Sequence, residues 1–409
     1  MASRRVSIIS LHYPPEATGV APYAAGLAAG LSARGHQVTT YAAQPFYPEW
    51  RHRPGYGQWK TTEVLEGVTI NRRKHYVPRT PRGVRRLLSE LSFGFRLLAS
   101  ELSPDSVVVA VSPALFATAM VAIRIRLTPR RPRLVVWVQD IYTIGLVETM
   151  EGGPFSTSIT KFVERFVLRA ADQVVVIHPR FAEDLVEMLH IDQERITVIR
   201  NWTHLEPTSG ISQRDARASL GWPTDVFLAV HTGTMGAKTG LANVVEAARL
   251  ADEAQAPIRF VLVGDGGERA ELENLARGVH RIDFVDPLDD KNYLSALAAA
   301  DCLLVNELPG VAAMASPSKL TSYFDAGRPI VAATDPQGIT AAEIKQSSAG
   351  IVVPAGNPAA LLSRVLKISE DMETAAQFGA AGRRYRLEVL DSDAAISTFE
   401  NLIEEVAER

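Results

Sequence analysis

The stretch VFLAVHTGTMGAKTGLANVVEAARLA, residues 226–251, decides the fold. Its first five residues form a short apolar run that is typical of a buried β-strand, and residues 241–251 are typical of a helix. A polar, glycine-rich segment, 231–240, joins the two. Strand, loop and helix in this order predict one unit of an open parallel sheet that is covered by helices on both faces.

The same alternation continues on both sides of this stretch. Before it we expect strands at 5–11, 36–42, 106–111, 134–138, 173–177 and 196–199, and helices at 20–33, 82–101 and 156–170. After it we expect strands at 258–263, 282–285, 302–305, 329–332 and 351–353, and helices at 268–276, 293–299 and 319–326. Residues 359–409 are nearly all helical in pattern.

The alternation breaks once, in the polar segment 201–210, which we interpret as a linker. A chain of 409 residues also exceeds the size that one hydrophobic core serves. The sequence therefore predicts an α/β protein with two doubly wound domains, 1–203 and 204–388. A C-terminal helix, 389–409, is expected to pack back on the first domain.

Composition excludes several classes of protein. The net charge of -3 gives no support to a nucleic-acid partner, and 46% hydrophobic residues argue against disorder. The single cysteine, Cys302, lies in an apolar run and is expected to be buried, which fits a reducing cytoplasm. The apolar N-terminal stretch is broken by His12 and two prolines, and segment 113–123 is too short to span a membrane. We expect a cytoplasmic protein that is soluble or peripheral.

Candidate anion-binding residues follow the strands, where open α/β sheets bind ligands. Gly233, Thr234 and Lys238 lie in a loop that opens a helix, which suits a diphosphate, although a solvated lysine is the alternative. The loop lacks the order of a Walker A motif. Gly264 and Asp265 follow the next strand in a turn that, taken alone, is weak support.

Three further segments are candidates. Ser316, Pro317, Ser318 and Lys319 begin a helix, so the serines are either helix caps or phosphate ligands. Gly19 stands at the start of the first helix, where a phosphate or sugar could approach the backbone, or where an ordinary loop could end. Gln139 and Asp140 end a buried strand, and a helix cap is the simpler role for Asp140.

Basic residues gather in two places in the first half of the chain. The clusters are Arg72, Arg73, Lys74, Arg79, Arg82, Arg85 and Arg86, and Arg124, Arg126, Arg130, Arg131 and Arg133. Such clusters are usually solvated, but they could also bind anionic lipid or a lipid diphosphate. The metal-binding motifs C-x-x-C and H-E-x-x-H are absent, so we expect no metal cofactor.

Taken together, these motifs resemble glycosyltransferase family 4, whose members have the GT-B fold of two facing Rossmann-like domains with a central cleft. The resemblance covers nearly the whole chain and is closest to the subgroup of the colanic-acid fucosyltransferase and the O-antigen N-acetylfucosaminyltransferase. The residues that carry it are His12 to Glu16, Thr18-Gly19, Gly35-His36, Gln44-Pro45, Tyr47-Pro48, Gln139 to Tyr142, Asn201-Trp202, Gly233 to Gly240, Pro317 to Lys319, Tyr323 and Gly327 to Pro329.

The resemblance implies a retaining transfer from a UDP- or GDP-sugar without a catalytic metal. The acceptor would be a glycan, lipid-diphosphate-linked in view of the basic first half, and the pathway would be polysaccharide biosynthesis. Gln139, Asp140 and Lys238 would be catalytic. The donor would contact Gly19, Gly233, Thr234, Lys238, Gly264, Asp265, Val285, Ser316, Pro317, Ser318 and Lys319, with Val285 meeting the nucleobase through its backbone.

The chain departs from the family pattern in two ways. Two glutamates that usually read the sugar and the ribose are replaced by Met314 and Ser322. The usual arginine of the phosphate loop is replaced by Thr234 or Met235. Two alternatives therefore stand beside the transferase: a nucleotide-sugar epimerase of the same fold, and a non-catalytic nucleotide-sugar-binding protein.

Overall fold

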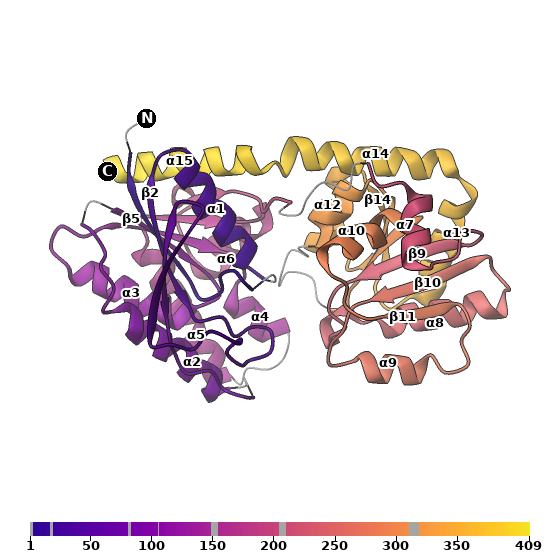
Figure 1. The fold of residues 1–409 in the computed structure, drawn as a ribbon, viewed down its shortest axis with the longest axis horizontal. Helices are drawn as coiled ribbons and strands as arrows, with labels where there is room; N and C mark the ends of the chain where they lie inside the picture. The colour runs from indigo at the N-terminus through magenta and orange to yellow at the C-terminus, as the bar shows by residue number, and fades with distance from the viewer. Residues whose placement is uncertain are drawn as a thin grey trace. The chain divides into compact units, whose positions relative to one another are not determined.

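The computed structural model describes residues 3–16, 19–80, 83–104, 106–148, 154–203, 210–310 and 319–409. The chain divides into two compact units (Figure 1). The first unit consists of Met1–His204 and Ser392–Arg409, and the second of Leu205–Asp391. Each unit is built on its own sheet, with helices before and after the strands.

The first unit holds an eight-stranded sheet in the order β3-β4-β2-β1-β5-β6-β7-β8. Its strands are β1 (Arg5–Ser10), β2 (Gln37–Ala43), β3 (Lys60–Leu65), β4 (Val68–Arg73), β5 (Ser106–Val111), β6 (Arg133–Val138), β7 (Gln173–Val176) and β8 (Ile196–Val198). Its helices are α1 (Ala21–Ala33), α2 (Val84–Leu97), α3 (Leu115–Leu127), α4 (Tyr142–Glu148), α5 (Pro154–Ala170), α6 (Pro179–Leu189), the short η1 (Gln193–Arg195) and α15 (Ser392–Glu408). All pairings are parallel except β3 with β4.

The β3–β4 hairpin was not predicted from the sequence. β3 pairs antiparallel with β4 at the edge of the sheet, and most of its side chains are exposed. An exposed edge strand lacks the continuous apolar run by which buried parallel strands are recognised. The turn between the strands, Glu66 and Gly67, has φ angles of 51° and 75°, and a type I′ hairpin turn requires positive values at both positions.

The C-terminal helix α15 packs on the first unit, against α1 and β5. α1 approaches it closely at Gly30, because a Cβ atom there would lie 2.5 Å from Ile396 Cδ1. His36 Nε2 lies 2.9 Å from Glu400 Oε1 in a buried pair. Close packing and a buried hydrogen bond therefore attach α15 to the unit.

The second unit holds a six-stranded parallel sheet in the order β11-β10-β9-β12-β13-β14. Its strands are β9 (Phe227–Thr232), β10 (Ile258–Val263), β11 (Ile282–Val285), β12 (Cys302–Asn306), β13 (Ile330–Thr334) and β14 (Gly350–Pro354). Its helices are α7 (Gln213–Leu220), the short η2 (Ala237–Thr239), α8 (Ala242–Glu253), α9 (Arg269–Leu275), α10 (Asp290–Ala299), α11 (Lys319–Ala326), α12 (Ile339–Ser347), α13 (Pro358–Glu370) and α14 (Met372–Val389).

The core of the second unit lies on both faces of this sheet. In β10, Phe260 and Leu262 belong to one hydrophobic cluster, whereas Val261 and Val263 belong to another. Alternate residues of a strand point to opposite faces, so both faces of β10 are covered. Cys302 is buried in the first cluster, which agrees with the expectation from its apolar run.

Candidate functional site

The loops that follow β9, β10 and β11 meet through their backbones at one edge of the second sheet. Gly233 N donates to Val263 O and Gly264 N donates to Val285 O, each at 2.9 Å. Gly264 has a φ of 139°, and a Cβ atom there would lie 2.0 Å from Gly233 O. No side chain fits at that distance, so glycine is what allows the two loops to touch.

Lys319, the first residue of α11, extends beneath the loop that follows β9. Its Nζ lies 3.3 Å from the position that a Cβ atom of Gly233 would occupy, and 3.3 Å from His231 Nε2. His231 is fully buried, and its Nδ1 lies 3.2 Å from Leu304 O. Because that carbonyl can only accept, Nδ1 carries the proton and Nε2 accepts from the ammonium of Lys319.

The electrostatics of this pair favour an incoming anion. Burial, followed by the charge of Lys319, holds the pKa of His231 well below its usual range, so the ring is neutral. Burial lowers the pKa of Lys319 to about 8, although the Glu307 carboxylate opposes that shift. The ammonium therefore persists at neutral pH with little solvation, and an anion would interact with it strongly.

Two further residues belong to this group: Glu307, which was not predicted from the sequence, and Tyr323, which the sequence offered only as a residue of the family motif. Glu307 directly follows β12, and its carboxylate accepts hydrogen bonds from Thr334 Oγ1 and, at 2.5 Å, from Thr340 Oγ1. Tyr323 is buried one helical turn after Lys319, and its hydroxyl accepts from Thr232 N at 2.9 Å. Glu307 could have been proposed from the sequence, because it is a polar residue that directly follows a strand, the same signal that pointed to Gln139.

The other predicted residues of the second unit lie in the same loops. Lys238 belongs to η2 and its side chain is exposed, while its carbonyl accepts from Leu308 N at 2.9 Å. Thr234 and Asp265 are exposed, and Val285 contributes its backbone carbonyl to Gly264, as described above. Ser316, Pro317, Ser318 and also Met314 lie outside the described residues. The structure thus brings together Gly233, Gly264, Val285 and Lys319.

In the first unit, a buried carboxylate ties together the loops after β1 and β2. Glu16 Oε1 accepts from Phe46 N at 2.7 Å and from Tyr47 N at 2.8 Å. Its Oε2 lies 2.8 Å from His12 Nδ1. Gly19 stands in the turn before α1 with a φ of 66°, is exposed, and has open space where a Cβ atom would be.

Gln139 is buried at the end of β6, and its side chain is paired with that of Asn201. Gln139 Nε2 donates to Asn201 Oδ1 at 3.1 Å, and Asn201 Nδ2 donates back to Gln139 Oε1 at 2.8 Å. Ser112 Oγ accepts from the backbone N–H groups of Gln139 and Asp140 at 2.8 and 3.3 Å. This pair joins two motifs of the sequence, and it belongs to the first unit rather than to the group around Lys319.

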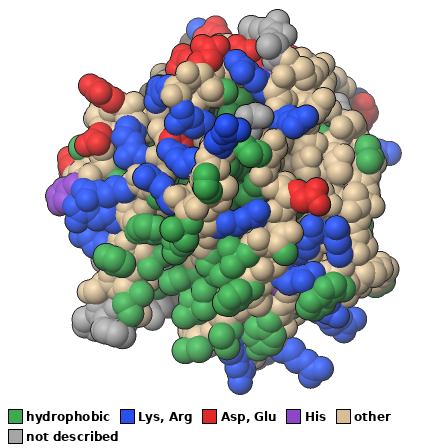
Figure 2. Space-filling view, turned by 90° about the vertical axis from the view of Figure 1, so that its left-hand side faces the viewer, with side chains coloured by type: hydrophobic (Ala, Val, Ile, Leu, Met, Phe, Trp, Pro, Cys, Tyr) green, Lys and Arg blue, Asp and Glu red, His purple; other side chains and the backbone are tan. Residues whose placement is uncertain are grey.

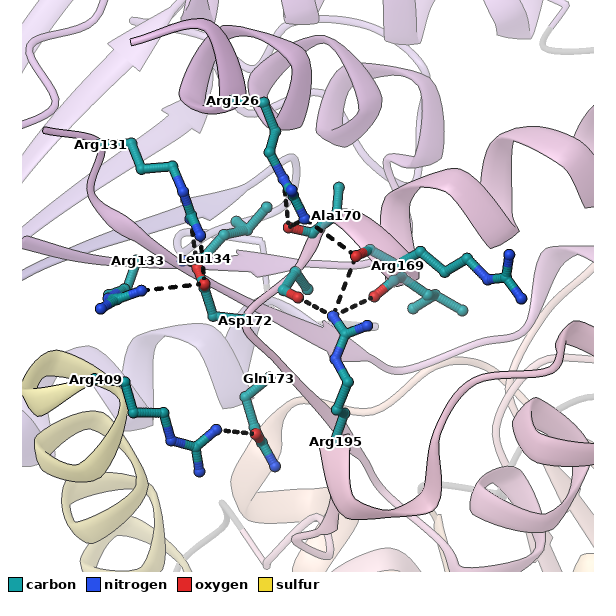
Figure 3. Close-up of polar contacts among 12 residues, drawn as sticks. Arg126, Arg131, Arg133, Leu134, Arg169, Ala170, Asp172, Gln173, Arg195 and Arg409 are labelled. Carbon is teal, nitrogen blue, oxygen red and sulfur yellow. Dashed lines mark hydrogen bonds and ion pairs between the residues drawn. The ribbon is translucent and has the colours of Figure 1, made fainter. Parts of the chain in front are cut away.

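Much of the second basic cluster has a structural role at the end of α5 (Figure 3). Arg126 Nη2 donates to the carbonyls of Arg169 and Ala170 at 3.2 and 3.0 Å. Carbonyls at a helix C-terminus have no partner within the helix and can accept such bonds. Arg131 binds Asp172 through two hydrogen bonds of 2.8 and 2.7 Å. These guanidinium groups are engaged within the protein.

Two residues of the first basic cluster are also internal. Arg72 and Arg73 are buried in β4, and Arg72 pairs with Glu63 of β3 at 2.5 Å. They are therefore not part of a charged surface.

Within the described ranges, no group of three His, Cys, Asp or Glu side chains is placed to hold a metal ion. A metal that bridges a diphosphate would need clustered carboxylates, and the sequence does contain one D-x-D triplet, Asp391 to Asp393. It lies at the start of α15, where Asp393 pairs with Arg34 at 3.1 Å.

Comparison with known proteins decides the family. Residues 18–202 match the glycosyl transferase 4-like domain, and residues 212–385 match the glycosyl transferases group 1. Over 339 residues the chain is 31% identical to WcaI of Escherichia coli K12, a glycosyl transferase named for colanic acid biosynthesis, with 79% of this chain and 81% of that protein covered. The chain belongs to glycosyltransferase family 4. The subgroup predicted from the sequence is confirmed.

Solved structures confirm the GT-B fold of this glycosyltransferase. Sucrose-phosphate synthase from Thermosynechococcus elongatus superposes with a TM-score of 0.75 at 18% identity, covering 98% of this chain and 99% of that one. HepE of Anabaena, solved in complex with UDP-glucose, gives a TM-score of 0.70 at 14% identity, with 98% and 99% covered. At these identities the likeness concerns the fold alone.

Proposed function

We propose that this glycosyltransferase binds a UDP- or GDP-sugar through the loops after β9 and β10 and transfers the sugar with retention of configuration. The observation that carries the proposal is Lys319, a half-buried ammonium beneath Gly233 whose pKa is lowered to about 8 by burial. HepE, which shares the fold, was solved with UDP-glucose bound. A sparsely solvated cation beside an exposed glycine-rich loop suits a diphosphate better than a neutral ligand.

In the proposed mechanism the sugar–phosphate bond breaks on the same face on which the acceptor hydroxyl attacks. Charge develops on the leaving diphosphate, and Lys319, Lys238 and the loop amides stabilise it. The leaving phosphate accepts the proton of the acceptor hydroxyl, so the step needs no strong protein base. Gln139 and Asp140 remain our proposed catalytic residues of the first unit.

The remaining donor contacts are proposed on the same grounds. The backbone of Val285 meets the nucleobase, and Gly19 and Asp265 contribute to donor binding. We also propose that Ser316 and Ser318 bind phosphate oxygens. No metal is required in this scheme, because the two lysines take over the neutralisation of the diphosphate that a cation would otherwise provide.

We propose a glycan carried on a lipid diphosphate as the acceptor, and polysaccharide biosynthesis as the pathway. The relative WcaI is named for colanic acid biosynthesis. No helix among the described residues has the length and hydropathy to cross a membrane. An enzyme that modifies a lipid-linked substrate would then work in the cytoplasm, peripherally at the inner face of the membrane.

The test is transfer from UDP- or GDP-sugars to a lipid-diphosphate acceptor in the presence of EDTA, with the anomeric configuration of the product read by NMR. Lys238→Ala should reduce the rate about 100-fold, the scale for losing one group that stabilises a developing anion. Lys367→Ala, an exposed lysine of α13, is the matched control. An unchanged rate in Lys238→Ala would remove that residue from the mechanism, and conversion of the donor without acceptor would favour an epimerase.

A further inference from the structure

Three neighbouring helices of the first unit carry apolar side chains on their exposed sides. α2 packs against α3, and α3 packs against α5. The exposed apolar residues recur at helical spacing: Val84, Leu88 and Phe95 on α2, Ile123 and Leu127 on α3, and Ile159, Phe162 and Phe166 on α5. The outer side of a surface helix is normally polar. We refer to these eight residues as the three-helix face.

The largest side chains of the three-helix face are mostly exposed. Leu127 is 79% exposed, Phe162 73% and Phe95 65%. On the face of the first unit turned to the viewer in Figure 2, hydrophobic side chains form one broad area bordered by Lys and Arg. A contiguous apolar area of this kind marks a binding surface on a soluble protein.

The exposed charge on the helices of the three-helix face has a single sign. The sequences of α2, α3 and α5 contain two acidic residues, Glu90 and Glu164, and both are buried. Glu90 accepts from Phe116 N at 3.2 Å, and Glu164 accepts from Tyr142 N at 2.7 Å, so both carboxylates serve helix starts. The basic residues of these helices are Arg85, Arg86, Arg96, Arg124, Arg126, Lys161, Arg165 and Arg169.

The helices are fixed to one another, so the three-helix face is a preformed surface. A Cβ atom on Gly94 of α2 would lie 3.0 Å from the Cα of Ala117 in α3, which shows how closely the two backbones approach. Arg124 of α3 donates to Leu97 O at 3.1 Å and to Ser100 O at 2.7 Å, at the end of α2. The exposed stripes therefore stay side by side.

We propose that the three-helix face docks on an anionic lipid bilayer. Phenylalanine and leucine side chains enter the boundary between headgroups and acyl chains, and neighbouring Lys and Arg contact the anionic headgroups. Basic charge without exposed acidic residues on the same helices favours an anionic lipid surface over a protein partner. The inference rests on the membrane association proposed above and assigns it to this face.

The experiment is vesicle flotation of the full chain with phosphatidylcholine alone and with equal parts of phosphatidylcholine and phosphatidylglycerol. We expect binding to the anionic vesicles only. Leu127→Ser with Phe162→Ser should weaken it more than about tenfold, from the lost apolar burial. Arg85→Glu with Lys161→Glu should also weaken binding more than about tenfold, because each basic residue contributes about fivefold to the affinity for an anionic surface. All four positions are exposed, so the melting temperature should not change.

Matched controls come from exposed positions of the second unit. Met372→Ser with Leu387→Ser repeats the apolar change, and Arg364→Glu with Lys367→Glu repeats the charge change. Both should bind as the wild type does. Equal binding by all variants, or no binding by the wild type, would overturn the proposal. A dimer that Leu127→Ser with Phe162→Ser dissociates would assign the face to a second copy. Vesicle binding uses neither donor nor acceptor, so its failure is distinct from failure of the proposed reaction.

Discussion

The lowered pKa of Lys319 makes nucleotide binding depend on pH in a range where ordinary lysines do not titrate. With a pKa of about 8, roughly nine in ten Lys319 side chains are charged at pH 7 and roughly one in ten at pH 9. Only the charged form attracts a diphosphate. The apparent Kd of a nucleoside diphosphate should therefore rise about tenfold between these two pH values.

The assay is isothermal titration of the full chain with UDP or GDP, using whichever raises the melting temperature more. Two variants provide the comparison. Lys319→Arg keeps its charge across the range, because guanidinium groups stay protonated in proteins. Lys319→Met has no charge at any pH, and should bind weakly throughout. Any titration of the nucleotide itself affects all three proteins equally. It therefore cancels when the Kd of the wild type is divided by the Kd of each variant.

The expected pattern is specific. The Kd of the wild type divided by that of Lys319→Arg should rise about tenfold from pH 7 to pH 9. The Kd of the wild type divided by that of Lys319→Met should rise by the same factor and approach one, because the wild type then loses its charge too. Parallel profiles for all three proteins would refute the reasoning, because Lys319 would then not contact the diphosphate. A wild-type transition only above pH 10 would show instead that Lys319 is well solvated.

Three further predictions concern the scaffold. Gly264→Ala should lower the free energy of unfolding by more than about 2 kcal/mol in urea, whereas Gly267→Ala, where a Cβ atom has open space, should change it little. In a double-mutant cycle, Gln139→Ala and Asn201→Ala should show a coupling of about 1 kcal/mol in stability, and additive effects would refute the pairing. Burial opposes ionisation of Asp172, but hydrogen bonds from Arg131 and Leu134 N lower its pKa overall. The stability that Asp172→Asn removes at neutral pH should therefore be lost progressively as the pH falls below the ordinary aspartate pKa of about 3.9 and through the lowered pKa of Asp172.

The sequence predicted those parts of the fold that local pattern determines. The strand expected at 106–111 is β5 (Ser106–Val111), whose side chains are all buried, so its apolar run is continuous. The glycines after β9 and β10 were placed at the sheet edge for a similar reason, because strand ends can be read from the chain. The β3–β4 hairpin escaped prediction because an exposed edge strand shows no such run.

The electrostatics of the site could not be read from the sequence, because they arise from residues far apart in the chain. His231 and Lys319 are 88 positions apart, and Gln139 and Asn201 are 62 apart. Each partner was visible as a polar residue in a motif or beside one, but the pairing exists only once the sheet has formed. The lowered pKa of Lys319 depends on burial, which no local spacing determines.

The central claim is that the loops of the second unit bind the diphosphate of the donor. Hydrogen–deuterium exchange of the full chain, with and without UDP or GDP, tests it most directly. We predict that the nucleotide slows exchange in peptides covering residues 233–240 and 264–268 and the start of α11, and leaves the three-helix face unchanged. Protection confined to the first unit, or none with either nucleotide, would contradict the claim.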